Sequence, residues 1–243
     1  MATNTKNILV GAADLFISSA SGTSRPSTSS TTLRSLFGTT TGTSARTGLL
    51  SSSDYREVGF TSSGLEVSYE PNYGEVMVDQ LLDAARLFKQ TLKVMLKTEL
   101  VEGTLENLTL SWGQMDSYYV NASGSTISQV STISQTTPVT SEVGATMNMA
   151  AGALGDAPVE RVLVAVGNAP YKLGAASTTS DARNKERVYV ARRVVSIDTT
   201  AHGLKRDSAT VFPVSFRCLP DDTSATYAGA EYGVVIDRVW GAA

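Results

Sequence analysis

The chain has 243 residues, of which 42% are hydrophobic and 18% are charged, and its formal net charge is −3. This length and composition are typical of a soluble globular protein that buries a substantial core. The slightly acidic balance argues against a general nucleic-acid-binding protein, because such proteins carry a basic surplus. The single cysteine, Cys218, excludes an intramolecular disulfide and suits a reducing cytoplasm.

The first predicted element is a strand at Ile8–Ile17, where β-forming residues surround Gly11, Ala12 and Ala13 and leave room for a bulge. This stretch imitates a signal peptide, but Asp14 interrupts its apolar run and no A-x-A cleavage site follows. No apolar run in the chain reaches about 18 residues, so no transmembrane helix is expected.

A long loop is predicted at 18–53, because 21 of these 36 residues are Ser or Thr and such a segment buries little surface. Its few large apolar residues form two small clusters, Leu33-Leu36-Phe37 and Leu49-Leu50. Two interpretations stay open. Either the clusters anchor the loop to a neighbouring molecule, or the loop is a flexible surface extension.

The most informative stretch runs from residue 64 to residue 113. After Tyr55–Phe60, alternation of apolar and polar residues at 65–70 predicts a half-buried strand. The sequence at 71–74, PNYG, is typical of a turn, and Val76 and Val78 then resume the alternation in a return strand. A further alternation from Arg86 to about Thr98 predicts a strand of roughly 40 Å at ~3.3 Å per residue, long for a compact monomer.

A short helix follows the long strand. Leu105, Leu108 and Trp112 form one helical stripe, with Thr104 as the predicted N-cap and Gly113 as the predicted end. Because an apolar stripe normally packs on its own sheet, Trp112 is predicted to belong to the core of the subunit. The simpler interpretation is the hairpin and helix of any α+β domain, which the pattern alone does not exclude.

The second half of the chain predicts more strands. One begins at Tyr118-Tyr119-Val120, and four more lie at Arg161–Val166, Arg187–Ile197, Phe212–Leu219 and Tyr232–Trp240. The region 125–143 alternates imperfectly, which fits exposed strands or an extended loop, and 177–185 is a polar loop. Met147 and Met149 fit either core packing or contacts that adapt to a partner, and core packing is the favoured interpretation. In all, nine to twelve strands and one clear helix are expected.

No residue is predicted to be catalytic, cofactor-binding or metal-binding, and no cofactor is expected. His202 lies in a turn-like sequence without a nucleophile motif, and Cys218 is interpreted as a small buried apolar residue. Asp221 and Asp222 follow Pro220 in a predicted turn and are interpreted as solvated acids. Asp237-Arg238 in the last strand are interpreted as exposed charges.

Four fragments resemble the major tail tube proteins of long-tailed (siphovirus-type) bacteriophages: GLEVSYEPNYGEVMVDQ, TLENLTLSWG, FPVSFRCLPDD and ILVGAADLFIS. They occur in the order expected for the family and cover about a third of the chain. The long Ser/Thr loop at 18–53 and the region 125–143 depart from the family's motifs, so the resemblance implies no role for them.

The resemblance implies a mainly β chain, with residues 1–243 as a single tail tube domain. The implied fold is an antiparallel β-sandwich or barrel-like domain with one flanking short helix, the long loop at 18–53, and a loop or strand excursion at 114–160. Such a domain is a structural subunit and not an enzyme. Its copies form rings, hexameric in the family, which stack into a helical polymer.

The polymer of the family is the hollow tail tube of the virion, assembled in the host cytoplasm without a membrane. The implied partners are copies of the chain itself and other tail proteins, such as the tape measure and terminator proteins. Genomic DNA passes through the lumen during ejection without specific binding. One alternative is another viral structural protein, such as a tail terminator or a capsid decoration protein. A second alternative, which the sequence favours less, is a β-sandwich binding module or enzyme.

Charge is distributed unevenly along the chain. Residues 54–107 carry ten acids and five bases, whereas residues 181–217 carry eight bases and four acids. Opposed patches of this kind favour head-to-tail association of copies. Pairing of the charges within one domain explains the same distribution, and both interpretations stay open.

Overall fold

The structure is a computed structural model that describes residues 11–18, 44–52, 54–80, 83–115, 119–121, 145–149, 151, 154–169, 185–198, 201–204, 206–207, 209–221 and 228–239. The predictions for Ile8–Val10, Leu33, Leu36, Phe37, Tyr118, 125–143, 177–184, Asp222 and Trp240 lie outside these residues.

The described part of the chain is mainly β, with ten strands and two short helices. In chain order they are β1 (Asp14–Ser18), α2 (Ala45–Leu50), β2 (Tyr55–Glu57), β3 (Thr61–Val76), β4 (Arg86–Leu100), α3 (Leu105–Ser111), β5 (Tyr119–Asn121), β6 (Ala145–Met147), β7 (Arg161–Asn168), β8 (Lys185–Ser196), β9 (Phe212–Cys218) and β10 (Gly233–Val239). The predicted fold class is confirmed. The prediction of a single helix is wrong, because the described residues contain two short helices.

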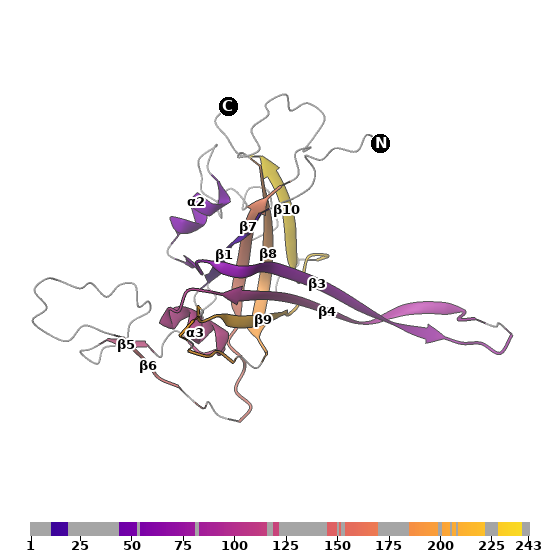
Figure 1. The fold of residues 1–243 in the computed structure, drawn as a ribbon. Helices are drawn as coiled ribbons and strands as arrows, with labels where there is room; N and C mark the ends of the chain where they lie inside the picture. The colour runs from indigo at the N-terminus through magenta and orange to yellow at the C-terminus, as the bar shows by residue number, and fades with distance from the viewer. Residues whose placement is uncertain are drawn as a thin grey trace, which may run out of the picture.

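Eight strands form one antiparallel sheet in the order β2-β1-β7-β8-β9-β4-β3, and β10 also pairs with β8. One edge of β8 is shared, because its first part pairs with β10 and its last residues, Val194–Ser196, pair with β9. The sheet therefore divides at β8. In Figure 1, β1, β7, β8 and β10 run together, and β3, β4 and β9 cross them as a second layer, which agrees with the expected sandwich-like fold.

The main core lies between these two layers. Its buried members come from β1, β4, β7, β8, β9, α3 and the segment after β2: Leu15, Ile17, Val58, Leu96, Leu100, Leu110, Leu163, Ala165, Ala191, Val194, Phe212, Val214, Phe216 and Cys218. In β9 the residues Val214, Phe216 and Cys218 are buried while Arg217 is exposed. The alternation predicted for this strand is thus confirmed.

A second core covers the other face of β1, β7 and β8, where α2 packs. Its buried members are Phe16, Ala45, Leu49, Tyr55, Val162, Val164, Val166, Val188 and Val190. Because both of its faces are covered, β7 is buried from Arg161 through Val166. This explains why its sequence is a continuous apolar run and not an alternation.

Helix α2 corrects the prediction that 18–53 is entirely loop. Ser44 caps the helix, since its hydroxyl accepts a hydrogen bond from the backbone N–H of Thr47. Leu49 is fully buried and Leu50 is 54% exposed, so this cluster anchors the segment to its own domain. Within the described residues, the first strand begins only at Asp14, and Gly11 has a φ of +143° before it.

The predicted turn at 71–74 is wrong, because β3 continues through it to Val76. Proline is tolerated there since β3 is the edge strand of the sheet. The register shifts between Asn72 and Tyr73, where Gln90 is an extra residue on β4. The chain reverses between Val76 and Arg86 instead. The long strand predicted from Arg86 is confirmed, and it extends to Leu100.

Helix α3 confirms the predicted cap, because the Thr104 hydroxyl accepts from the N–H of Asn107, and Gly113 has a φ of +63°. The predicted core position of Trp112 is wrong. The buried residues of α3 are Asn107, Thr109, Leu110 and Ser111, and half-buried Trp112 is the C-cap. Its ring lies 6.2 Å from that of His202.

The methionines after the helix differ from each other. Met147 in β6 is half-buried, and its Sδ lies 2.8 Å from the Thr109 hydroxyl. Met149 is 76% exposed, so its interpretation as core packing is wrong.

Candidate subunit interface

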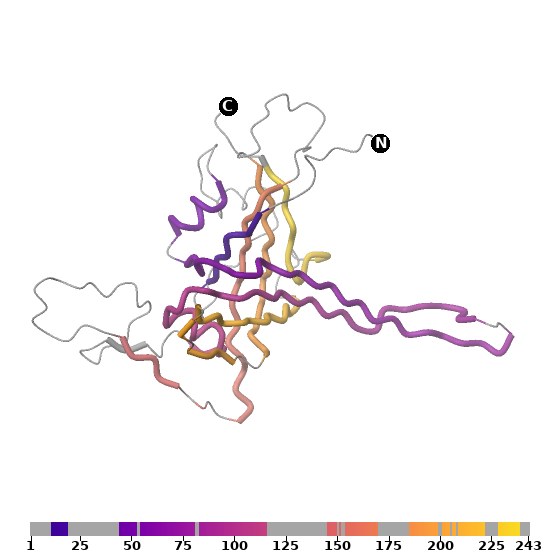
Figure 2. The backbone as a smooth tube through the Cα atoms, in the orientation of Figure 1, coloured from indigo at the N-terminus to yellow at the C-terminus, as the bar shows by residue number. Residues whose placement is uncertain are grey.

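The most prominent feature of the molecule is a hairpin that projects from the body, formed by the distal parts of β3 and β4 (Figures 1 and 2). Strand β4 pairs with β9 only from Val94 to Leu100. Among the described strands, β3 pairs with β4 alone along its whole length. Beyond Val94 each of the two strands pairs with no other described strand, and from the body the Tyr232 hydroxyl donates to the Leu92 carbonyl oxygen at 3.5 Å. We call the described residues of 69–93 the hairpin arm.

The hairpin arm exposes large apolar side chains. Those at least a third exposed are Tyr69 (61%), Tyr73 (55%), Val76 (42%), Met77 (62%), Val78 (36%), Leu87 (60%) and Phe88 (44%). An isolated two-stranded hairpin is marginally stable in water. Large apolar side chains are exposed along both strands, and exposed apolar surface marks interaction sites. The arm thus has the character of a surface that is covered in an assembly.

Two contacts across the strands support the extended conformation of the arm. Phe88 lies over Gly74, since a Cβ at Gly74 would lie only 2.6 Å from the Cζ of Phe88. The Nζ of Lys89 donates a hydrogen bond of 3.0 Å to the Tyr69 hydroxyl and lies 5.4 Å from the centre of its ring. The hydrogen bond with Tyr69 raises the pKa of Lys89. These contacts favour one shape for the hairpin before any partner binds.

The body end of β3 and β4 is held by a polar cluster around α3. The Asn107 side chain donates to the carbonyl oxygens of Val58 (2.8 Å) and Glu102 (3.0 Å) and accepts from Arg56 (2.9 Å). The Glu102 carboxylate accepts from the N–H of Phe60 at 3.1 Å. Because Asn107 is only 1% exposed, these bonds fix the path by which the chain enters β3. In the sequence, Asn107 is notable only because it leaves a capping box incomplete.

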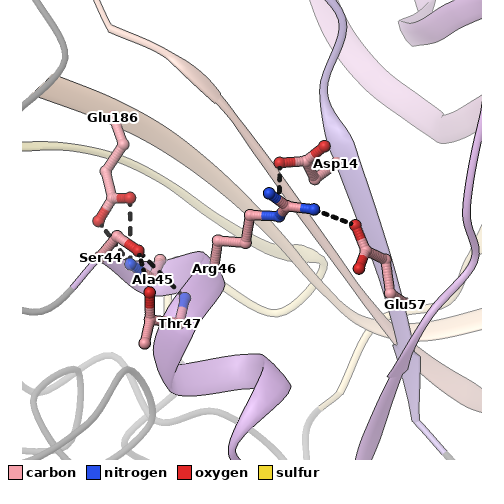
Figure 3. A network of polar contacts seen from close by, with 7 residues as sticks. All are labelled: Asp14, Ser44, Ala45, Arg46, Thr47, Glu57 and Glu186. Atoms are coloured by element: carbon pink, nitrogen blue, oxygen red, sulfur yellow. Dashed lines mark hydrogen bonds and ion pairs between the residues drawn. The ribbon is translucent and has the colours of Figure 1, made fainter.

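The segment before the arm is anchored by α2 (Figure 3). The buried carboxylate of Glu186 accepts from the N–H of Ala45 at 2.8 and 3.1 Å and also pairs with Arg238. Arg46 bridges Asp14 (3.2 Å) and Glu57 (2.9 Å). Burial raises the pKa of Asp14, and Arg46 opposes this shift. Strands β1, β2 and β8 are thereby connected through one short helix.

Charge on the arm is separated by strand. The acids Glu70 and Glu75 of the arm, and Glu66 just before it, lie on β3, whereas the bases Arg86, Lys89 and Lys93 lie on β4. Glu70 is opposite Lys93 in the register. Within the described residues, the only polar side-chain contacts of these six are those of Glu70 with Ser68 and of Lys89 with Tyr69. One edge of the arm is therefore acidic and the other is basic.

Some of the described bases at 181–217 are engaged within the domain. Arg187 binds Asp237 through two bonds of 2.5 and 2.7 Å, and Arg193 binds Glu160 at 2.6 and 2.8 Å. Arg187 lowers the pKa of Asp237. Internal pairing thus accounts for Arg187 and Arg193 in this patch. Asp237 and Arg238 are half-buried and paired, so their interpretation as exposed charges is wrong.

The residues considered for chemistry have structural surroundings. Cys218 is buried, and this burial raises the pKa of its thiol to about 12. The His202 ring lies 4.7 Å from that of Phe212. Asp221 is fully buried, which corrects its interpretation as a solvated acid. Within the described ranges, no group of three or more His, Cys, Asp or Glu residues is placed to hold a metal ion.

Neither the comparison with protein-family models nor that with curated proteins found a match to this chain. No helix within the described residues is long and apolar enough to cross a membrane.

Proposed function

We propose that this chain is a structural subunit that assembles with copies of itself through the hairpin arm. The observation that carries the proposal is the arm itself, whose described residues include seven exposed large apolar side chains and whose two outer edges have no described strand beside them. Exposed edges and apolar strands favour aggregation in a monomer, whereas in an ordered polymer they become the bonds between subunits. Burying each such side chain contributes roughly 1–2 kcal/mol.

The assembly we propose is the tail tube of a long-tailed bacteriophage. Support comes from the fragments that resemble the tail tube family, which lie close together in space. The first contributes most of β3, the second contains α3, and the third forms β9, which pairs with β4 and packs against α3. The proposal includes stacked, hexameric rings, the tape measure and terminator proteins as partners, and DNA passing through the lumen of the virion's tail. No enzymatic activity is proposed.

Negative-stain electron microscopy of the purified chain tests this proposal. We expect tubes of constant diameter, formed spontaneously or with tail components. Assembly that stops at a single ring would favour a tail terminator, and binding to a capsid shell would favour a decoration protein. A chain that stays monomeric with and without tail components would contradict assembly altogether.

A shortened variant tests the role of the arm. Residues 70–93 are replaced by an Asn-Gly turn that connects Tyr69 to Val94, which are opposite each other in the hairpin. Leu96 and Leu100 stay in place, so the body should unfold at the same denaturant concentration as the full chain. We expect this variant to be monomeric by sedimentation. Tubes formed by it would assign the assembly contacts to the body instead.

A further inference from the structure

From the charge on its two edges, we infer that the hairpin arm of one copy pairs with the arm of the next, β3 of one against β4 of the other. Opposite charge selects this arrangement over every other pairing of the two edges. The inference rests on the proposed self-assembly and names the partner surface and its polarity.

Both edges of the arm are open to strand addition. The outer edge of β3 has no strand beside it among the described residues, and β4 lacks a second strand until Val94. At the inner end of the β4 edge the Tyr232 hydroxyl binds the Leu92 carbonyl oxygen at 3.5 Å, so the part of this edge offered to a neighbouring copy lies from Arg86 to Thr91. A strand beside either edge would satisfy its outward N–H and C=O groups, as in β-augmentation. When arms that point the same way are placed side by side, each β3 meets a β4 that runs antiparallel to it. The antiparallel pairing of β3 with β4 within one hairpin therefore continues from one copy to the next.

Charge separates the pairings that the backbone alone would permit. Two β3 edges together would oppose Glu66, Glu70 and Glu75 with their own copies, and two β4 edges would do the same with Arg86, Lys89 and Lys93. Like charges opposite each other destabilise a sheet, and opposite charges stabilise it. Only β3 against β4 places the acidic edge beside the basic edge. This contact is heterologous, so each copy keeps one open edge for the next.

The charges are available for this contact. The six side chains lie on exposed positions of β3 and β4. Within the described part of the chain, no ion pair joins Glu70 to Lys93 although the two are opposite in the register. The charged side chains of the two strands can therefore form ion pairs with a neighbouring copy.

Charge exchange tests the inference with three variants. Glu70→Lys with Glu75→Lys makes both strands basic, and Arg86→Glu with Lys93→Glu makes both acidic. The third variant carries all four substitutions and exchanges the signs of the strands at these positions. Lys89 is left unchanged because it contacts Tyr69. Guanidinium denaturation confirms that the body of each variant is folded.

We expect each two-substitution variant to need a concentration at least about tenfold higher than the wild type for assembly, because like charges then face each other across copies. An equimolar mixture of the two should assemble at nearly the wild-type concentration, with the variants alternating. The four-substitution variant should assemble with itself and exclude wild-type chains. For the wild type, salt should raise the required concentration, since it screens the edge charges.

The outcomes separate the two proposals. If the wild type assembles and both two-substitution variants assemble equally well, or if their mixture shows no recovery, charge matching between arms is wrong while self-assembly stands. If the wild type forms no assembly under any of these conditions, self-assembly and this inference fail together.

Discussion

At the scale of single residues, buried polar side chains hold the peripheral elements to the body. Glu186 is the clearest case, because its carboxylate accepts from the first N–H of α2 and pairs with Arg238 while only 5% of the residue is exposed. A helix of six residues has little stability of its own. The position of α2 therefore depends on this contact and on the burial of Leu49.

The first prediction concerns this carboxylate. Glu186→Gln removes the charge that pairs with Arg238 and weakens the cap of α2. We expect the free energy of unfolding to fall by about 2–3 kcal/mol, since the variant loses a mostly buried ion pair with Arg238 and a charge-assisted hydrogen bond to the N–H of Ala45. Chemical denaturation of the monomer measures the change.

Arg46→Ala is the matched control for the same helix. The Arg46 side chain is 50% exposed, and its ion pairs with Asp14 and Glu57 lie at the surface. Exposed pairs contribute about 0–1 kcal/mol. A loss as large as that of Glu186→Gln would mean that the surface bridge, and not the buried carboxylate, holds α2.

At the scale of elements, β8 organises the sheet because it pairs with β7, β9 and β10. The junction with β10 depends on Gly233, which has a φ of +149°. A Cβ at this position would lie 2.0 Å from the carbonyl oxygen of Val190. Since this neighbour is backbone in a buried strand, it has little freedom to move away.

The second prediction is that Gly233→Ala destabilises the protein by at least about 3 kcal/mol, from backbone strain and the clash with Val190. Gly229→Ala is the control, because Gly229 also has a positive φ of +82° but no atom lies within 4 Å of where its Cβ would be. This change should lower the stability by only about 1 kcal/mol. Equal losses in the two variants, measured by thermal unfolding, would show that conformation alone and not the contact with β8 limits this position.

The elements that were predictable are those whose local pattern matches their surroundings. Strand β9 has one buried face, and its sequence alternates between buried apolar residues and more exposed residues. Helix α3 has its N-cap at Thr104 and ends before Gly113. Helix α2 was not predictable, because six residues within a Ser/Thr-rich stretch give no helical period and tertiary packing decides. The false turn at 71–74 has a similar cause, since only the edge position of β3 accommodates Pro71 within a strand.

The candidate interface was predictable only in part. The length of β4 indicated a strand too long for a compact body. The charge distribution was detected as a difference between two segments, whereas the structure places the separation between the two strands of one hairpin. The net charge of residues 54–107 adds the charges of both strands together, so the basic character of β4 does not show in it. The pairing of the strands had to be known before their charges could be compared.

At the scale of the whole molecule, stability and assembly are located in different parts. Both buried cores belong to the body, where β7 and β8 are covered on both faces. The hairpin arm beyond Val94 contributes no residue to either core. Local openings of the arm should therefore require much less free energy than openings of the body.

The third prediction is a difference in amide hydrogen exchange that changes on assembly. In the dilute monomer, amides of β7 and β8 should exchange slowest and those of 70–76 and 86–93 fastest, because the latter have open edges and little burial. On assembly, the arm amides should slow by at least about tenfold as neighbouring strands and side chains cover them. The largest gain in protection from exchange should occur at amides whose N–H points away from the partner strand of the hairpin, since a neighbouring copy binds these N–H groups.

The shortened variant with residues 70–93 replaced is the control for the body, whose exchange should match that of the monomeric full chain. Unchanged exchange of the arm after assembly would contradict its role in the interface, even if tubes form. Protection that appears on the body strands instead would place the contacts between copies there. A pattern confined to the arm would show that one hairpin carries the association while the two-layered body keeps its own fold.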